Sequence, residues 1–184
     1  MTALLIVVAV LGVAGIGIYN SLVRKYNQVD SAFSTIDVQL TQRYDLIPKL
    51  VETVKQYMTH ERGLLEDIVR LRSQAAASHD MKEKVALDND LTRKLGQLNV
   101  TMENYPQLKA SDTFVQLQRS MNEVEEQLAA ARRSYNAAVT DYNNAVETIP
   151  SSIVAGITDH TKRELFVADE ARRRDVDVKS LFKA

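Results

Sequence analysis

The chain has 184 residues, and its 23 basic side chains nearly balance its 24 acidic ones. Without a basic excess, its charge gives no reason to expect a nucleic acid as partner. The chain contains no cysteine, which excludes disulfides, thiolate metal sites and a cysteine nucleophile. It has only three prolines and six glycines, so we expect few, long helices.

The first 23 residues carry no charged side chain, and residues 3–18 are an unbroken run of apolar residues and glycine. A helix of this length reaches about 34 Å, which is enough for a bilayer core of about 30 Å. A cleaved signal peptide is the alternative, but it normally has a positively charged start, and this chain starts Met1-Thr2. The sequence therefore predicts a retained transmembrane anchor over residues 1–23.

The charges that flank the anchor predict its orientation. Arg24 and Lys25 follow the apolar run directly, and no basic side chain precedes it. The positive-inside rule then places the body in the cytoplasm and the N-terminus outside. Tyr19 and Tyr26 suit the interface between the bilayer and water.

An apolar stripe leaves the anchor and continues along the chain with gaps of three and four residues, from Leu22 to Met58. This spacing predicts an amphipathic helix. The pattern can be followed to Ala76, so we expect one first helix from Tyr19 to Ala76, about 87 Å long. Pro48 lies inside it and should kink it, because proline removes a backbone donor and crowds the preceding turn.

Three further helices are predicted. The second spans Met81–Met102 and ends before Tyr105-Pro106, and the third has a heptad-like, coiled-coil pattern between Ser111, its expected N-cap, and Pro150. A short fourth helix, capped by Ser151 or Ser152, should reach about Ile157. The predicted fold is therefore all-α: a transmembrane helix (1–23), an antiparallel bundle with three long helices and a short fourth (24–157), and a charged tail (158–184).

The direction of the third helix is left open by the sequence. The second and third helices, about 33 and 58 Å long, together nearly equal the first, so both could run back beside it toward the membrane. A hairpin at Tyr105-Pro106 is the alternative, and it would send the third helix outward and leave Pro150 far from the membrane.

A Tyr-Asn dipeptide occurs in two pairs, each with a spacing of seven residues, so each pair lies on one helix face. The dipeptides are Tyr19-Asn20, Tyr26-Asn27, Tyr135-Asn136 and Tyr142-Asn143. One interpretation is that tyrosine fills core positions while asparagine faces water or a neighbouring helix. The other is that buried amides set the register of two helices against each other, because a buried amide needs a partner. If the third helix runs back to the membrane, the two pairs should face each other there.

No catalytic, cofactor or metal site is predicted. His60-Glu61 begins like a zinc-protease motif, but Leu64 occupies the position of the second histidine. A di-iron bundle would need Glu-x-x-His, which does not occur. The remaining clustered carboxylates are interpreted as solvated helix faces; they are Glu61, Glu66, Asp67, Glu123, Glu125 and Glu126.

Separate segments, in order along the chain, match the pattern of a known family. They are Tyr19-Asn20-Ser21-Leu22-Val23, Ile36-Asp37-Val38-Gln39-Leu40, Arg43, Asp45-Leu46-Ile47-Pro48, Leu50-Val51, Glu103-Asn104-Tyr105-Pro106, Leu108-Lys109-Ala110, Phe114, Leu117-Gln118, Glu125, Ala131-Arg132-Arg133, Tyr135-Asn136, Tyr142-Asn143 and Pro150. On these residues the chain resembles the LemA family of bacterial membrane proteins. The resemblance implies a helical bundle on a single-pass anchor in the bacterial cytoplasmic (inner) membrane, with no catalytic residues and no cofactor.

Two functions are considered. The first is a scaffold that assembles laterally into a membrane-attached homo-oligomer, since a first helix much longer than the second would leave part of its apolar stripe without a partner. The second is an adaptor that presents a helical face or the charged tail to a partner such as a membrane protease or a sensor. For either function the expected packing and oligomer residues are Tyr19, Asn20, Tyr26, Asn27, Pro48, Tyr135, Asn136, Tyr142 and Asn143.

Overall fold

The structure is a computed structural model that describes residues 1–78 and 80–166. Its elements are α1 (Thr2–Lys55), α2 (Arg62–Ala77), α3 (Met81–Met102), α4 (Pro106–Lys109), α5 (Asp112–Glu147) and α6 (Ser151–Ile157). No strand occurs in these two ranges. The all-α class and the long apolar helix at the N-terminus are therefore confirmed.

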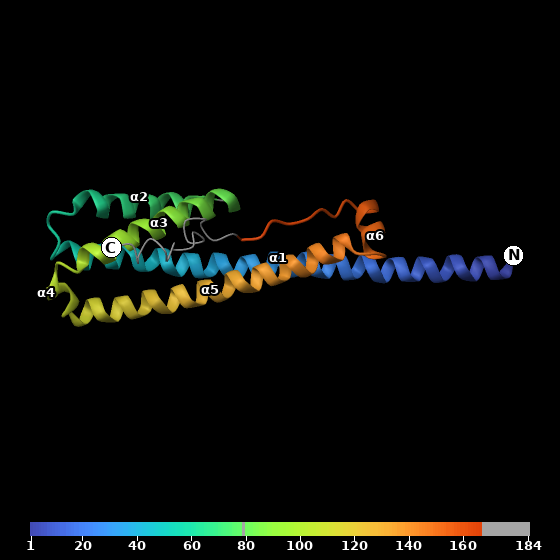
Figure 1. Cartoon of the computed structure of the whole chain (residues 1–184), viewed down its shortest axis with the longest axis horizontal. Helices are drawn as coiled ribbons and strands as arrows, with labels where there is room; N and C mark the ends of the chain where they lie inside the picture. The colour runs from blue at the N-terminus through green and yellow to red at the C-terminus, as the bar shows by residue number, and fades with distance from the viewer. Residues whose placement is uncertain (79, 167–184) are drawn as a thin grey trace, which may run out of the picture.

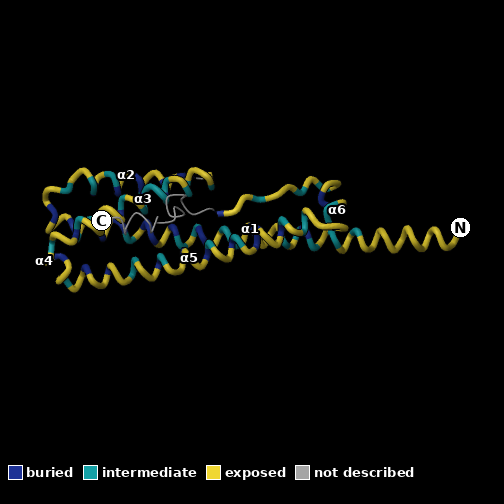
Figure 2. Tube along the Cα trace, in the orientation of Figure 1, coloured by how far each residue is buried: buried dark blue, intermediate teal, exposed yellow. Residues whose placement is uncertain are grey.

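α1 is the axis of the molecule (Figure 1). Its 54 residues correspond to a rod about 81 Å long. The N-terminal part projects beyond every other element and is exposed along its length (Figure 2), and burial begins only at Leu22. Pro48 lies inside α1 on an exposed face and does not end it.

The first helix is shorter than predicted, because it ends at Lys55 instead of continuing to Ala76. The chain turns over residues 56–61, and α2 folds back along the body (Figure 1). Met58 and Leu65 keep the phase of the stripe, but the four residues that follow Met58 are polar. Met58 and Leu65 are seven residues apart, which is about two helical turns, so the apolar spacing looks continuous although the apolar residue expected between them is missing. The chain reverses at this gap.

α5 lies against α1 and runs in the opposite direction. Tyr26 contacts Tyr142, while farther along α1 Phe33 contacts Tyr135. α3 does not continue into α5 in one line; the chain reverses through α4, and α3 packs on α2 instead (Figure 1). The structure thus differs from both expected layouts: a reversal follows Tyr105, yet Pro150 lies near the apolar part of α1.

The smaller elements follow the sequence closely. Ser111 takes the N-cap position of α5, although its side chain forms no capping hydrogen bond. α5 ends before Pro150, and α6 ends at Ile157 as predicted. From the predicted tail, residues 158–166 are described: Thr158 and Asp159 form a turn, residues 160–166 run back along the body without helix or strand (Figure 1), and Phe166 is buried in the core. The remaining part of the tail lies outside the described residues.

Candidate functional site

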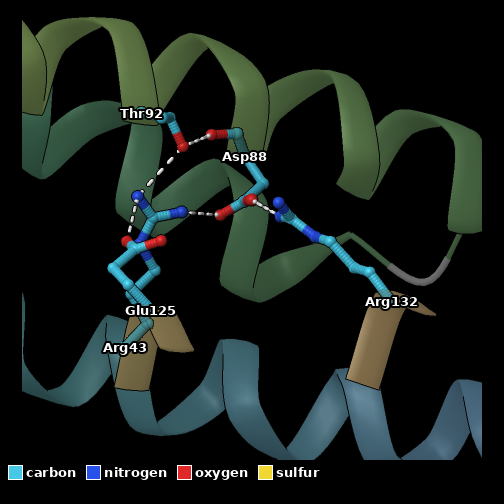
Figure 3. Close-up of polar contacts among 5 residues, drawn as sticks. All are labelled: Arg43, Asp88, Thr92, Glu125 and Arg132. Atoms are coloured by element: carbon cyan, nitrogen blue, oxygen red, sulfur yellow. Dashed lines mark hydrogen bonds and ion pairs between the residues drawn. The ribbon is translucent and has the colours of Figure 1, made fainter. Parts of the chain in front are cut away.

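A group of charged side chains lies where α1, α3 and α5 meet (Figure 3). Asp88, on α3, is almost completely buried and accepts two charge-assisted hydrogen bonds. Arg43 Nη1, from α1, donates to Asp88 Oδ1 at 2.7 Å, and Arg132 Nη2, from α5, donates to Oδ2 at 2.7 Å. One carboxylate therefore joins three helices through both of its oxygens.

The second half of the Arg43 guanidinium is also paired. Its Nη2 donates to Thr92 Oγ1 at 2.9 Å and forms an ion pair with Glu125 Oε1 at 2.7 Å (Figure 3). Thr92 in turn donates to the backbone carbonyl of Asp88 at 2.8 Å. The sequence suggested that Glu125 is a solvated carboxylate. In the structure it is paired with Arg43, although its side chain is still 41% exposed.

The charges of this group, which we call the Arg43 network (Arg43, Asp88, Thr92, Glu125 and Arg132), balance as two cations and two anions. Burial lowers the pKa of the Arg132 guanidinium, and Asp88 opposes that effect. A buried charge is costly unless it is paired, so wrong alignments of α3 on α1 and α5 are disfavoured. This arrangement suits the alignment of helices, because the charged groups form ion pairs with one another.

A second polar arrangement holds residues 163–166 along α5. Asn143 Oδ1 accepts from the Arg163 N–H at 2.9 Å, and Asn143 Nδ2 donates to the Arg163 carbonyl at 2.9 Å. Asn136 binds Phe166 in the same way, at 2.7 and 3.0 Å. We call these four hydrogen bonds the asparagine latch.

The spacing of the latch follows from backbone geometry. Seven residues of a helix rise about 10.5 Å, and three extended residues span about 10 Å. Asn136 and Asn143 therefore match Phe166 and Arg163 without strain. The sequence singled out these asparagines. Within the chain Asn20 and Asn27 are exposed and do not pair with them, and the amides of α5 hold the segment that follows α6 instead.

The tyrosines of the same dipeptides do meet. Tyr26 and Tyr142 stack edge to face at 5.8 Å between ring centroids, and His160 lies 6.1 Å from the rings of both Tyr19 and Tyr26. The guanidinium of Arg163 lies 4.4 Å from the centroid of Tyr26. The predicted tyrosines thus join α1, α5 and the segment after α6, whereas Pro48 lies farther along α1.

Two of the cavities lie next to features described above. One, of about 290 Å³, borders the Arg43 network and is lined by Leu50, Leu95, Phe114 and Met121 among others. The other, of about 560 Å³, lies at the reversal between α1 and α2. Among the described residues no group of three His, Asp or Glu side chains is placed to hold a metal ion.

The model of the LemA family matches residues 32–180, which includes the Arg43 network and the asparagine latch. The chain belongs to the LemA family. The match also extends past Pro150, to which the resemblance had been traced in the sequence, into the charged tail.

Similar proteins fall into two groups. Protein LemA of Metamycoplasma hominis is 29% identical over 90% of this chain and 76% of its own length. Magnetosome protein MamQ of Magnetospirillum gryphiswaldense is 22% identical over 80% of this chain, and MamQ 2 of Paramagnetospirillum magneticum is 29% identical over 55%. The alignments span 64% and 38% of these two MamQ proteins, less than two thirds of either.

The family match starts within α1, after its apolar part. That part is long and apolar enough to cross a membrane, with a mean hydropathy of 2.4, and none of it is buried in the protein. This LemA protein therefore has one candidate membrane span among its described helices, and the span is continuous with a helical body.

Proposed function

We propose that this LemA protein is a membrane-anchored helical scaffold that assembles laterally with copies of itself and has no catalytic activity. The observation that carries the proposal is the continuity of α1, which passes from the candidate span into the body without a break. A body joined to its anchor by a helix keeps a defined orientation to the membrane, whereas a flexible linker would not fix it.

The body is braced along this axis. α5 packs on α1 over much of its length, and the Arg43 network ties α3 to both helices. The asparagine latch and the tyrosine contacts close the end next to the span. Most polar groups at these places pair with one another, which supports rigidity, whereas Arg43 Nε, Arg132 Nε and the Tyr142 hydroxyl have no hydrogen-bond partner among the described residues.

The lateral contact is assigned to the outer face of α5. In the sequence, an unpartnered apolar stripe on a first helix about 87 Å long was the reason to expect self-assembly. That reason no longer applies, because α1 ends at Lys55. On α5, Ala131 and Ala138 face the core, while Ala130, Ser134 and Ala137 are exposed at helical spacing. Small side chains on one face allow a second helix to approach closely.

The protein is proposed to lie in the bacterial cytoplasmic membrane with its body on the cytoplasmic side. Arg24 and Lys25, which follow the span, support this orientation. The cysteine-free chain allows a direct test in intact cells with a membrane-impermeant maleimide. We expect Thr2→Cys to be labelled and Val100→Cys to be protected until the cells are opened; the reverse pattern would overturn the orientation.

Self-assembly is tested by light scattering in a mild detergent. We expect a mass above that of one chain, and a shift toward the monomer in Ala137→Arg, which places a charge on the proposed contact face. Ala76→Arg is the matched control, because it makes the same change at an exposed position of α2. A wild-type monomer at native concentration would refute the scaffold.

The adaptor remains the second proposal, supported by the segment 163–166 that leads along α5 toward the charged tail. It predicts that affinity purification from the membrane recovers one other protein in a fixed ratio while the chain itself stays monomeric. If the chain self-associates but Ala76→Arg reduces self-association as much as Ala137→Arg does, the α5 face is not the contact.

A further inference from the structure

Three exposed isoleucines lie in the turn after α5 and on α6. Ile149, in the turn, is 82% exposed, and Ile153 and Ile157, four residues apart on one face of α6, are 60% and 78% exposed. Single exposed apolar residues are ordinary, but neighbouring ones form a patch that favours a partner. The other face of α6 is occupied, since Ala155 is buried.

The position of α6 identifies the partner. α6 packs on both α1 and α5, and the dark-blue N-terminal end of α1 projects beyond it (Figure 1). His160, just after α6, contacts Tyr19, which directly follows the apolar run. Within residues 3–18 every residue is exposed except Gly15 and Ile18, which are partly covered. α6 therefore lies at the level where α1 leaves the bilayer.

We propose that α6 is a second membrane contact, with the side chains of Ile149, Ile153 and Ile157 inserted between lipid acyl chains at the bilayer surface. The inference rests on the proposed anchoring of α1, since a bilayer around residues 3–18 has its edge at α6. Burial of these side chains in the interface is favourable because it removes apolar surface from water.

The residues around the patch suit the headgroup region. Ser151, Ser152 and Thr158 flank the isoleucines, and two cations follow, Lys162 paired with Glu147 and Arg163 paired with Asp30. Hydroxyl and cationic groups remain hydrated at the depth of the headgroups. With α1 crossing the bilayer and α6 lying on it, the body would be held at two points, which prevents it from tilting about the anchor.

The absence of tryptophan makes the test direct. Single-tryptophan variants are reconstituted in vesicles of phosphatidylcholine with brominated acyl chains, which quench a tryptophan that lies among them. Ile157→Trp reports on α6, and Ile153→Trp repeats the measurement at a second exposed position. Leu11→Trp reports on the span, and Val100→Trp, at a residue 73% exposed near the end of α3, reports on water.

We expect the Ile157→Trp and Ile153→Trp emission to shift to shorter wavelength and to be quenched nearly as strongly as that of Leu11→Trp. Val100→Trp should be unquenched. If Leu11→Trp is quenched and both α6 variants behave like Val100→Trp, the anchor stands and the second contact is wrong. A blue shift without quenching would assign the patch to a second copy of the chain and also overturn the inference. Lack of quenching in Leu11→Trp would overturn both proposals.

Discussion

At the scale of single residues, the Arg43 network carries the strongest energetic expectation. Arg43 and Asp88 are both buried, and each neutralises the other. Removing one partner leaves a buried charge without compensation, which costs far more than the pair itself contributes. Replacement of both by apolar residues of similar size removes the charges together and is far better tolerated.

We therefore expect Asp88→Ala to lower the free energy of unfolding by about 3–5 kcal/mol. The double variant Arg43→Met/Asp88→Leu should recover most of that loss. Glu125→Gln, at the exposed edge of the network, should cost less than about 1 kcal/mol. Denaturation in detergent, followed by circular dichroism, measures all three, and an Asp88→Ala loss no larger than that of Glu125→Gln would contradict the network's role.

Tyr44 provides an expectation for alkaline pH. Burial, and then the nearby Asp88 carboxylate, raise the pKa of Tyr44 well above its usual 10. In the unfolded chain Tyr44 ionises near its usual pKa, so above that pH the unfolded state binds fewer protons than the folded state. The contribution of Tyr44 to stability is thus fully present below about pH 10 and falls as the pH rises further.

The Tyr44 hydroxyl also has no hydrogen-bond partner among the described residues. Tyr44→Phe should therefore leave stability near neutral pH unchanged, or raise it by up to about 1 kcal/mol. It should also reduce the loss of stability between about pH 9 and pH 11. The exposed Tyr57→Phe is the control. Equal alkaline losses in both variants would show that Tyr44 is not the residue responsible.

Part of the network was visible in the sequence. Arg43 follows Leu40 by three residues and precedes Ile47 by four, so it lies in phase with the apolar stripe of α1, and Asp88 lies three residues before Leu91. A charged residue in phase with a stripe is a signal for a buried pair. The partners themselves could not be predicted, because they depend on how α2 and α3 fold back over α1 and α5.

At the scale of elements, the asparagine latch is the feature that sequence reasoning least anticipated. The repeat of seven residues was visible, but its partner is an extended segment whose sequence has no obvious pattern. We expect Asn143→Ala to speed amide exchange at Arg163, and Asn136→Ala to speed it at Phe166, because each variant removes the acceptor of that N–H. Exchange is measured by nuclear magnetic resonance.

The matched control for the latch is Asn144→Ala, an exposed asparagine on the same helix. It should leave both exchange rates as they are in the wild type. Unchanged exchange at Arg163 and Phe166 in all three variants would mean that the segment is held by the burial of Phe166 and by the contact of Arg163 with Tyr26, and that the four hydrogen bonds contribute little.

The long helices themselves were predictable from periodicity, and α3, α5 and α6 end where the sequence indicated. The end of α1 was missed, because Met58 and Leu65 preserve the helical phase across a turn. The direction of α5 was also beyond the sequence. Each chain reversal inverts the direction of the helix that follows, so the direction of α5 depends on how many reversals precede it. The reversal after Lys55 has no proline or glycine before Arg62 that would mark it in the sequence.

At the scale of the whole molecule, the protein is a helical rod with its candidate membrane span at one end. α1 joins the candidate span to the body, α5 returns along it, and α6 lies at the end of the body from which the N-terminal part of α1 projects (Figure 1). Membership of the LemA family fits such an architecture. The function proposed for it depends on whether these rods stand singly or side by side.

Lateral self-assembly is tested most directly by counting the chains in each particle in native membranes. The chains are counted by stepwise photobleaching of a fluorescent label at Val100→Cys. The account predicts several bleaching steps per spot at native expression, and fewer in Ala137→Arg than in the Ala76→Arg control. Single-step bleaching of wild-type spots would contradict lateral self-assembly.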